Sequence, residues 1–395
     1  MTASLLKHHH AQSFDLLVVA GEHSGDQHAA QMVEELISNY PSCQVATIGG
    51  MNLQQSGAFF LHDLVSHGVV GILEVLEHYP YFRKLMDELV AWIRTNQPRV
   101  LCLVDYPGFH LRLAKRLADE GLSTKGGGIT KVIYYISPQV WAWKKKRRFT
   151  MARYLDALSV LFPFEKEVFR DTSLEVEYVG HPFARNSETH NPFTYDRDGP
   201  IWLLPGSRSK AVSRIFPILL NAWQQLDKTT EKKEACVLYP DSQIYQRLLQ
   251  LTEGLPQEVA GRLHFCDQKS IRNTTASAVL TSSGTMSLKV ALAGIPGAIV
   301  YRANPLTYLL GKQLVSISYL GMANILLEAQ AWPEYLQNRA KASSLKNELH
   351  DCLMNESRQE KAKNAAEKLE HMLSTKAECS PAQWLAKKLN DAEIG

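Results

Sequence analysis

The hydrophobic and polar positions of this chain show one arrangement twice: a short apolar run, a turn that contains glycine, and an amphipathic stretch. The first copy has an apolar run at residues 14–20, followed by Gly21-Glu-His-Ser-Gly-Asp26. The second copy has Ile201-Trp-Leu-Leu-Pro-Gly-Ser-Arg208, followed by apolar residues at helical spacing. In such a strand, loop and helix, free main-chain N–H groups and the helix dipole attract phosphate. The repetition predicts two similar α/β halves that face each other across a cleft.

Together with the run at 201–204, apolar runs predict the strands of both halves. They lie at 15–20, 44–48, 100–104, 132–136, 157–161 and 176–179 in the first half and at 235–239, 263–266, 278–281 and 297–301 in the second. In the first half, helical patterns at 26–38, 72–95 and 110–120 alternate with the strands, which predicts a parallel sheet with helices on both faces. The fold class that we predict is α/β, with two Rossmann-like, doubly wound domains.

The domain boundaries follow from changes in this pattern. We expect an N-terminal domain over 14–190, a C-terminal domain over 200–345, and helices over 346–395 that pack across a domain or a partner. The polar run at 186–199 is the expected linker, and 302–340 is expected to be mostly helical, with Asn324 and the segment 333–337 at helix starts.

Candidate chemistry in the first half lies where strands end. Glu22, His23 and Ser24 follow the first strand, at the sheet edge where such folds bind ligands, although an ordinary polar turn is the alternative. Asp26 is a candidate cap for its helix. The strand at 100–104 delivers Asp105 to the same edge, where it is either a general base or a cap of the next helix.

Candidate phosphate-binding groups mark the second half. Arg208 stands at the first helix start, and the segment 282–296 carries a second one, which Ser283 or Thr285 is expected to cap. With Gly284 these residues predict a two-sided diphosphate cradle. Lys289 falls in the first turn or two of that helix, where a cation is unfavourable unless it reaches solvent or an anion lies nearby.

A surface segment follows the fourth strand. Trp141 and Trp143 precede five consecutive cations at 144–148, among them Lys144, Lys145 and Lys146. Aromatic rings beside a basic run are typical of a surface held against anionic lipid, whereas a solvated helix face is the alternative.

Composition narrows the class of protein. At 395 residues the chain suits two domains. A net charge of +3 gives no indication of a nucleic-acid partner. Six cysteines without C-x-x-C spacing are typical of reduced thiols in a cytoplasmic protein. Residues 1–13 lack the apolar core of a signal peptide, and no apolar run approaches the roughly 18 residues of a membrane helix.

Nine short motifs together resemble one family. They occur in the order GEHSGD, DYPGF, SPQVWAW, FPFE, VGHP, LLPGSR, SGTMSL, NPLTY and PEYLQ over residues 14–340. This order is similar to that in the lipid-A-disaccharide synthases of bacterial lipopolysaccharide biosynthesis. The resemblance implies a GT-B glycosyltransferase that is inverting and needs no metal or other cofactor. Its donor would be UDP-2,3-diacylglucosamine, its acceptor 2,3-diacylglucosamine 1-phosphate, and its products the β-1,6-linked disaccharide 1-phosphate and UDP.

The resemblance also implies roles for single residues. Asp105 would be the base, and Glu22 and Ser24 would lie near the acceptor or the reactive sugar. The donor side would include Arg208, Ser283, Gly284, Thr285, Lys289, Asn324, Glu334 and Gln337. Two positions depart from the family pattern. Lys289 replaces a Glu that grips the uridine ribose, and a cation cannot accept those hydrogen bonds. The loop at 321–324 lacks the usual Leu-Pro before Asn324.

The acyl chains of these substrates indicate where in the cell the enzyme is expected to act. They favour a cytoplasmic enzyme that associates peripherally with the inner membrane of a Gram-negative bacterium, with an anionic membrane surface as a partner and a homodimer as one state to test. The first alternative is another GT-B enzyme acting on a UDP-sugar, such as a 2-epimerase. The second is an inactive membrane-binding relative, which Lys289 alone supports.

Overall fold

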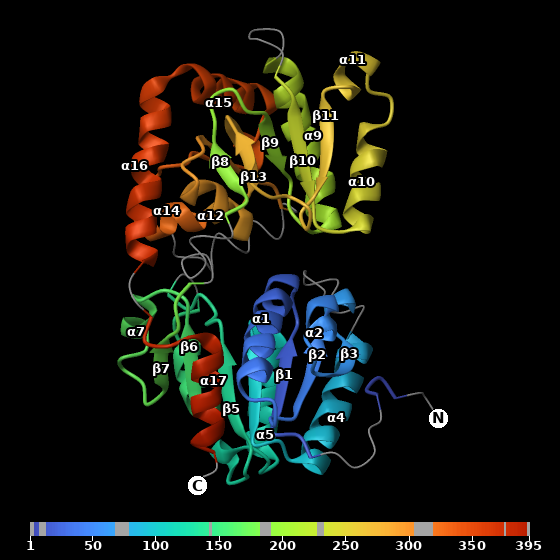
Figure 1. Cartoon of the computed structure of the whole chain (residues 1–395), viewed down its shortest axis with the longest axis vertical. Coiled ribbons are helices and arrows are strands. Elements are labelled where there is room, and N and C mark those ends of the chain that lie inside the picture. Colours follow the sequence, from blue (N-terminus) through green and yellow to red (C-terminus); the bar gives the residue numbers. More distant parts are fainter. Residues whose placement is uncertain are drawn as a thin grey trace. The chain divides into compact units, whose positions relative to one another are not determined.

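The chain divides into two units, Met1–Pro182 with Thr375–Gly395 and Phe183–Ser374 (Figure 1). The computed structural model describes a part of the chain. The NPLTY motif, Trp143 and the side chain of Thr285 are not among the described parts. The described residues are 4–7, 13–67, 79–141, 144–181, 191–226, 233–303, 319–374 and 377–392.

A parallel sheet of seven strands forms the centre of the first unit, in the order β3-β2-β1-β4-β5-β6-β7. The strands are β1 (Leu16–Ala20), β2 (Val45–Gly49), β3 (Phe59–Asp63), β4 (Val100–Val104), β5 (Lys131–Tyr135), β6 (Ala157–Val160) and β7 (Glu175–Tyr178). The central strands β1 and β4 are wholly buried and read LLVVA and VLCLV. Such continuous apolar runs are typical of parallel strands covered on both faces, and the expected strands of this half are confirmed.

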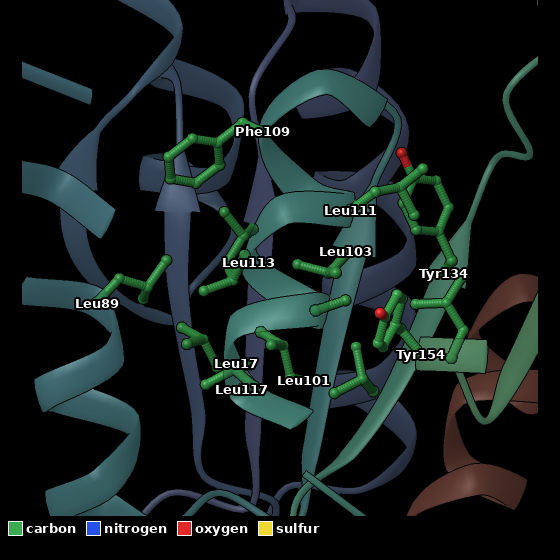
Figure 2. Packing of buried hydrophobic residues seen from close by; sticks show 14 of the residues in the cluster. Leu17, Leu89, Leu101, Leu103, Phe109, Leu111, Leu113, Leu117, Tyr134 and Tyr154 are labelled. Carbon is green, nitrogen blue, oxygen red and sulfur yellow. The ribbon is translucent and has the colours of Figure 1, made fainter. Parts of the chain in front are cut away.

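Helices pack on both faces of this sheet. They are α1 (His23–Asn39), α2 (Met51–Gln55), α4 (Tyr79–Asn96), α5 (Pro107–Asp119), α6 (Arg147–Tyr154), α7 (Glu165–Val168) and α17 (Pro381–Asn390), with short 3-10 turns at Val65–His67 and Thr124–Gly126. Figure 2 shows how α5 is seated, with Leu113 and Leu117 directed at Leu17, Leu101 and Leu103 of the strands. The first part of the helix expected at 72–95 lies outside the described residues; α4 accounts for the rest.

Asp26 does not cap its own helix as expected. It lies inside α1, whose cap position is Glu22. Its wholly buried carboxylate instead accepts hydrogen bonds from the main-chain N–H groups of Gly50 at 2.7 Å, Asn52 at 3.0 Å and Leu53 at 3.2 Å. These are the unpaired donors at the start of α2, so Asp26 caps a helix that lies one strand further along the chain.

The last helix of the chain, α17, belongs to the first unit and packs against α1. Its Lys388 is almost fully buried, and its Nζ lies 2.7 Å from carboxylate oxygens of both Glu175 and Glu177 on β7. Ser380 caps the helix and also donates a 2.6 Å hydrogen bond to Glu35 of α1. Buried charge pairs are costly to break because the remaining partner loses its compensation. These contacts therefore hold α17 against both α1 and β7.

A six-stranded parallel sheet forms the second unit, in the order β11-β10-β9-β13-β14-β15. Its strands are β9 (Ile201–Leu204), β10 (Ala235–Tyr239), β11 (Leu263–Asp267), β13 (Ala278–Ser282), β14 (Gly297–Tyr301) and β15 (Glu334–Leu336). Its helices are α9 (Ser209–Leu226), α10 (Ser242–Thr252), α11 (Gln257–Ala260), α12 (Thr285–Leu292), α14 (Met322–Leu327), α15 (Ala342–Met354) and α16 (Glu356–Leu373), with a 3-10 turn at Gln337–Arg339. The expected strands at 235–239, 263–266, 278–281 and 297–301 are confirmed.

Two expectations for this unit are wrong. The run expected to be a linker contains a strand, β8 (Phe193–Tyr195), which pairs in parallel with β12 (Thr274–Ala276). The segment expected to start a helix at 333–337 is mainly the edge strand β15. Local sequence alone did not show that a neighbouring strand, β12 or β14, would supply the pairing that makes each short segment a strand.

Candidate active site

Each of the two larger sheets has one point at which its strand order reverses. In the first unit the chain runs outward from β1 to β2 and β3, then returns to β4 on the other side of β1. In the second unit β9 and β13 have the same relationship. Open α/β sheets bind ligands at the carboxyl ends of the two strands at such a switch point. The loops singled out in the sequence therefore follow the strands at both switch points.

At the first switch point the structure brings Glu22 and Ser24 together with Asp105. Glu22 follows β1 and Ser24 lies in the first turn of α1, while Asp105 follows the neighbouring strand β4. The backbones approach closely, because a Cβ built on Gly25 would lie 3.5 Å from the Cβ of Asp105.

The loop after β4 has an unusual backbone. Asp105 has φ 51° and Tyr106 φ 50°, and Ile136 after the adjacent β5 has φ 67°. For residues other than glycine the left-handed region costs roughly 1–2 kcal/mol per residue. A β-branched residue such as Ile136 is rarest of all there. Strain of this kind persists only where the surroundings hold it, and it gathers at ligand sites.

The surroundings of Asp105 hold its main chain from both sides. Its N–H donates to the carbonyl of Tyr135 at 3.1 Å. Its carbonyl oxygen lies 2.6 Å from Nδ1 of His110 and also accepts a hydrogen bond from the hydroxyl of Tyr134. Neither donor was identified as a site residue from the sequence. His110 was visible only as the start of a helical pattern, and Tyr134 only as part of an apolar strand.

Burial and nearby charges shift the pKa values of three aromatic side chains at this site. Burial lowers the pKa of His110 to about 4, so the imidazole is neutral at pH 7. Burial, followed by the negative charge of Asp105, raises the pKa of Tyr134 well above its ordinary value. Burial and the charge of Glu22 raise the pKa of Tyr106. The site thus contains two carboxylates beside phenol groups that keep their protons, and His110 and Tyr134 are donors at neutral pH.

At the second switch point the loop after β9 lies close to the last residue of β13. Gly206 has φ 105°, and a Cβ built on it would lie 2.9 Å from Oγ of Ser282. Gly284 has φ 152° and ψ −171°, a conformation essentially restricted to glycine, and a Cβ on it would meet nothing within 4 Å. The exposed Arg208 immediately precedes α9, and Ser283 with Gly284 precedes α12, so two helix N-termini open at one sheet edge.

The expected cap of α12 is wrong. Gly284 occupies the cap position, and no side chain makes a cap hydrogen bond there. Ser287 instead turns back and donates a 2.6 Å hydrogen bond to the carbonyl of Gly284. The main-chain N–H groups at this helix start are therefore not bonded to a side-chain cap. An anion site at a helix start needs N–H groups that are available in this way.

Lys289 lies in the last turn of α12, because this helix has only eight residues. Near the carboxyl end of a helix a cation is favourable, so the expected conflict with the helix dipole is wrong. Burial lowers the pKa of Lys289. Its carbonyl accepts a 2.7 Å hydrogen bond from the side chain of Asn191. The side chain is partly buried, which does not match the alternative of a lysine reaching freely into solvent.

Asn324 and Glu334 form one network at the start of α14. The Glu334 carboxylate accepts hydrogen bonds from the N–H of Leu320 at 2.8 Å, the N–H of Gly321 at 2.9 Å and the Asn324 amide at 2.9 Å. Asn324 is wholly buried, and it also donates to the carbonyl of Trp332 and accepts from the N–H groups of Ala331 and Trp332. Both donors and both acceptor positions of its amide are used within the protein. This geometry makes Asn324 a residue that holds the loop.

Gln337 follows β15 at the same edge of the second sheet. It has φ 50°, and its side-chain Nε2 is buried without a hydrogen-bond partner among the described residues. A buried amide donor left unpaired costs roughly 1–3 kcal/mol, so this group is one that a ligand could satisfy.

The basic surface comprises Lys144, Lys145 and Lys146, which are all exposed; Trp143 lies outside the described residues. The ring of Trp141 packs edge-on against Phe164, with centroids 5.3 Å apart, and so does not project alone from the surface. Phe149 and Phe164 remain 47% and 37% exposed, so apolar rings do lie among the cations. None of the described helices is long and apolar enough to cross a membrane.

Comparison with known proteins shows which family this chain resembles. The family described as Lipid-A-disaccharide synthetase matches residues 16–389. The chain is 34% identical over 380 residues to lipid-A-disaccharide synthase 1 of Legionella pneumophila (strain Lens), covering 92% of this chain and 95% of the relative. It is also 34% identical over 351 residues to the lipid-A-disaccharide synthase of Geobacter sulfurreducens, covering 85% of this chain and 87% of the relative.

The chain belongs to the lipid-A-disaccharide synthase family. It is an enzyme, a glycosyltransferase of lipid A biosynthesis.

Solved structures agree on the fold of this lipid-A-disaccharide synthase family member. A glycosyltransferase of kitacinnamycin superposes with a TM-score of 0.59 at 9% identity, covering 96% of this chain and all of the other. A putative UDP-N-acetylglucosamine 2-epimerase from Listeria monocytogenes superposes with a TM-score of 0.56 at 12% identity, covering 94% of this chain and 99% of the other. At such identities the likeness concerns the fold alone, which is GT-B.

Proposed function

We propose that this enzyme transfers the diacylglucosamine unit of UDP-2,3-diacylglucosamine to 2,3-diacylglucosamine 1-phosphate, with inversion at the anomeric carbon. The observation that carries the proposal is the position of two chemically different groups in a member of this family. A carboxylate, Asp105, stands at the switch point of the first sheet, and the Arg208 loop stands at that of the second.

Asp105 has the role of general base in this proposal. The acceptor hydroxyl oxygen forms a bond to C1 of the donor sugar as its proton passes to the carboxylate, and the bond from C1 to the diphosphate breaks. A base placed by a rigid main chain assists such a step because proton transfer depends on position first and on pKa second. Glu22 and Ser24, which share the switch point, are proposed to contact the acceptor or the reacting sugar.

The second unit is proposed to stabilise the departing diphosphate. Negative charge grows on the leaving group, and donors fixed in advance stabilise it without reorganisation. The guanidinium of Arg208 and the helix start at Ser283, Gly284 and Thr285 supply such donors. Gln337 has a buried donor without a hydrogen-bond partner in the part of the chain that the structure describes, which supports a place for it in the donor site. Asn324 and Glu334 are proposed to shape this region through the loop that they hold.

The basic surface is proposed to hold the enzyme against an anionic membrane, where substrates with acyl chains reside. Three exposed lysines with partly exposed phenylalanine rings support this, because cations are attracted to anionic headgroups and apolar rings enter the interface.

An assay with both substrates tests the reaction. Donor and acceptor are incubated with the enzyme, UDP is measured, and the lipid product is analysed by mass spectrometry. The proposal predicts that UDP appears only when the acylated acceptor is present, together with a disaccharide 1-phosphate. Release of UDP from donor alone, with a changed configuration of the sugar, would indicate an epimerase. No product from either mixture would indicate an inactive relative.

A further inference from the structure

We propose that His110 and Tyr134 are positioning residues that act together on Asp105, by fixing the main-chain carbonyl from which its side chain is oriented. The inference rests on the proposed function, because it gives Asp105 the role of the base. It assigns a role in the reaction to two residues that lie on α5 and β5, outside the turns that follow the strands.

The first observation is the conformation that has to be held. Asp105 and Tyr106 are consecutive residues in the left-handed region, at φ 51° and 50°, and neither is glycine. A residue that relaxed from this region would rotate its Cα–Cβ bond and carry the carboxylate away. A catalytic group displaced by about 1 Å can lose two orders of magnitude in rate.

The second observation is that two side chains from different elements meet on one oxygen. The carbonyl oxygen of Asp105 accepts from Nδ1 of His110 on α5, at 2.6 Å, and from the hydroxyl of Tyr134 on β5. A carbonyl oxygen has two lone pairs, so these bonds saturate it. His110 and Tyr134 are each fully buried, so neither of these donors is exposed to solvent in the folded protein.

The third observation concerns the protonation of His110. A carbonyl can only accept, so the proton of the neutral ring lies on Nδ1. Nε2 is then an acceptor, and it is buried without a hydrogen-bond partner among the described residues. The ring is held by aromatic neighbours instead, with Tyr106, Phe109 and Tyr134 at centroid distances of 5.8, 6.0 and 6.1 Å. One ring nitrogen is thus left unsatisfied while the other is committed to Asp105. Burying Nε2 without a partner costs free energy, and this is consistent with His110 being present for the hydrogen bond from Nδ1 to Asp105.

The test compares variants that remove one donor each. Tyr134→Phe removes only the hydroxyl, and His110→Phe removes the donor while it keeps an aromatic ring. His110→Asn restores a donor, because the Asn amide nitrogen occupies the place of Nδ1. The matched control is Tyr154→Phe. Tyr154 belongs to the same hydrophobic core and lies in the view of Figure 2, but it makes no hydrogen bond to Asp105.

We expect kcat for UDP release from donor and acceptor to fall about 10-fold in Tyr134→Phe and at least as much in His110→Phe. The affinity for UDP, measured by calorimetry, should change less than 2-fold, because the donor site lies in the other unit. His110→Asn should recover most of the rate, and Tyr154→Phe should match the wild type. In an Asp105→Asn background, Tyr134→Phe should cause no further loss, since both changes act through one group.

The possible outcomes distinguish the positioning role of His110 and Tyr134 from the role of Asp105 as the base. Wild-type kcat in both Tyr134→Phe and His110→Phe, with Asp105→Asn inactive, would overturn the positioning role and leave the base assignment standing. A further 10-fold loss from Tyr134→Phe in the Asp105→Asn background would also overturn it. Normal turnover of Asp105→Asn itself would overturn both.

Discussion

Gly25 and Asp105 come from different strand ends of the first sheet, yet a Cβ on Gly25 would lie 3.5 Å from the Cβ of Asp105. This small separation shows that the helix start after β1 lies close to the loop after β4, and β1 and β4 are the two strands at the switch point. The acidic residue is thereby placed beside Glu22 and Ser24 by main-chain packing, which is more rigid than a surface loop.

Replacing Asp105 by Asn keeps the shape and most hydrogen bonds of the side chain but removes its basicity. We expect kcat to fall by roughly 10²–10⁴-fold with UDP affinity little changed. Steady-state assays and calorimetry measure the two quantities. Asp119→Asn, at the exposed far end of α5, is the control and should be fully active. If Asp105→Asn turns over normally, the base has to be sought at Glu22 or His23.

Arg208→Ala should weaken UDP binding by about 1.5–3 kcal/mol, the scale of a charge-assisted hydrogen bond. Arg208 is exposed just before α9, where a guanidinium can reach a diphosphate held by the two helix starts. Calorimetry with UDP measures the change. Arg214→Ala removes another exposed cation, one that lies within α9, and should bind UDP as the wild type does. Equal UDP affinity in Arg208→Ala and Arg214→Ala would refute the role.

Replacing Lys144, Lys145 and Lys146 by Gln should reduce binding to anionic vesicles by about 1 kcal/mol for each charge near the surface. Sedimentation with phosphatidylglycerol-containing liposomes at low salt measures it. The control replaces Lys361, Lys363 and Lys368, three exposed lysines of α16, by Gln. If both triple variants pellet like the wild type, the basic surface is an ordinary solvated face.

The family resemblance implies that Lys289 lies on the donor side, so Lys289→Ala should weaken UDP binding, and more at low salt than at high salt, because screening acts on the charge. Burial lowers the pKa of Lys289, so its contribution should disappear as pH rises, at a lower pH than for an exposed lysine. Calorimetry over salt and pH tests both. Lys289→Glu should bind UDP with a smaller salt dependence. An affinity that Lys289→Ala leaves unchanged at every ionic strength would show that another group contacts the donor.

Glu165 should make stability depend on pH. Burial raises its pKa to about 8 from 4.5, although its carboxylate accepts bonds from the N–H groups of Leu161 and Phe162. Between these values the folded protein keeps a proton that the unfolded chain releases, so the free energy of unfolding falls as pH rises. Glu165→Gln should flatten this dependence and be more stable than the wild type at pH 8.

Urea unfolding at pH 5 and pH 8 measures the effect. Glu167→Gln, whose side chain is 76% exposed in the same short helix, is the control and should follow the wild type. Parallel pH dependences for Glu165→Gln and the wild type would contradict the prediction.

Much of the fold could be predicted from the sequence for a physical reason. Parallel strands buried on both faces have to be apolar throughout, so β1, β4 and β9 stand out as continuous runs. Strand, glycine turn and helix occur within one short stretch of chain. The turns at 21–25 and 205–208 could therefore be located before their neighbours were known. The two-domain α/β class and the GT-B fold are confirmed, whereas the roles of the site residues stay predictions.

The tertiary structure decided what depends on residues far apart in the chain. Asp26 looked like a cap of its own helix but caps α2. The segment at Glu334 looked like a helix start but pairs with β14, and its carboxylate accepts hydrogen bonds from the N–H groups of Leu320 and Gly321 just before α14. The donors of His110 and Tyr134 meet at Asp105 only because α5 and β5 converge there. Periodicity and turn signals report the local backbone, whereas hydrogen-bond partners are chosen by packing between elements, which local sequence does not encode.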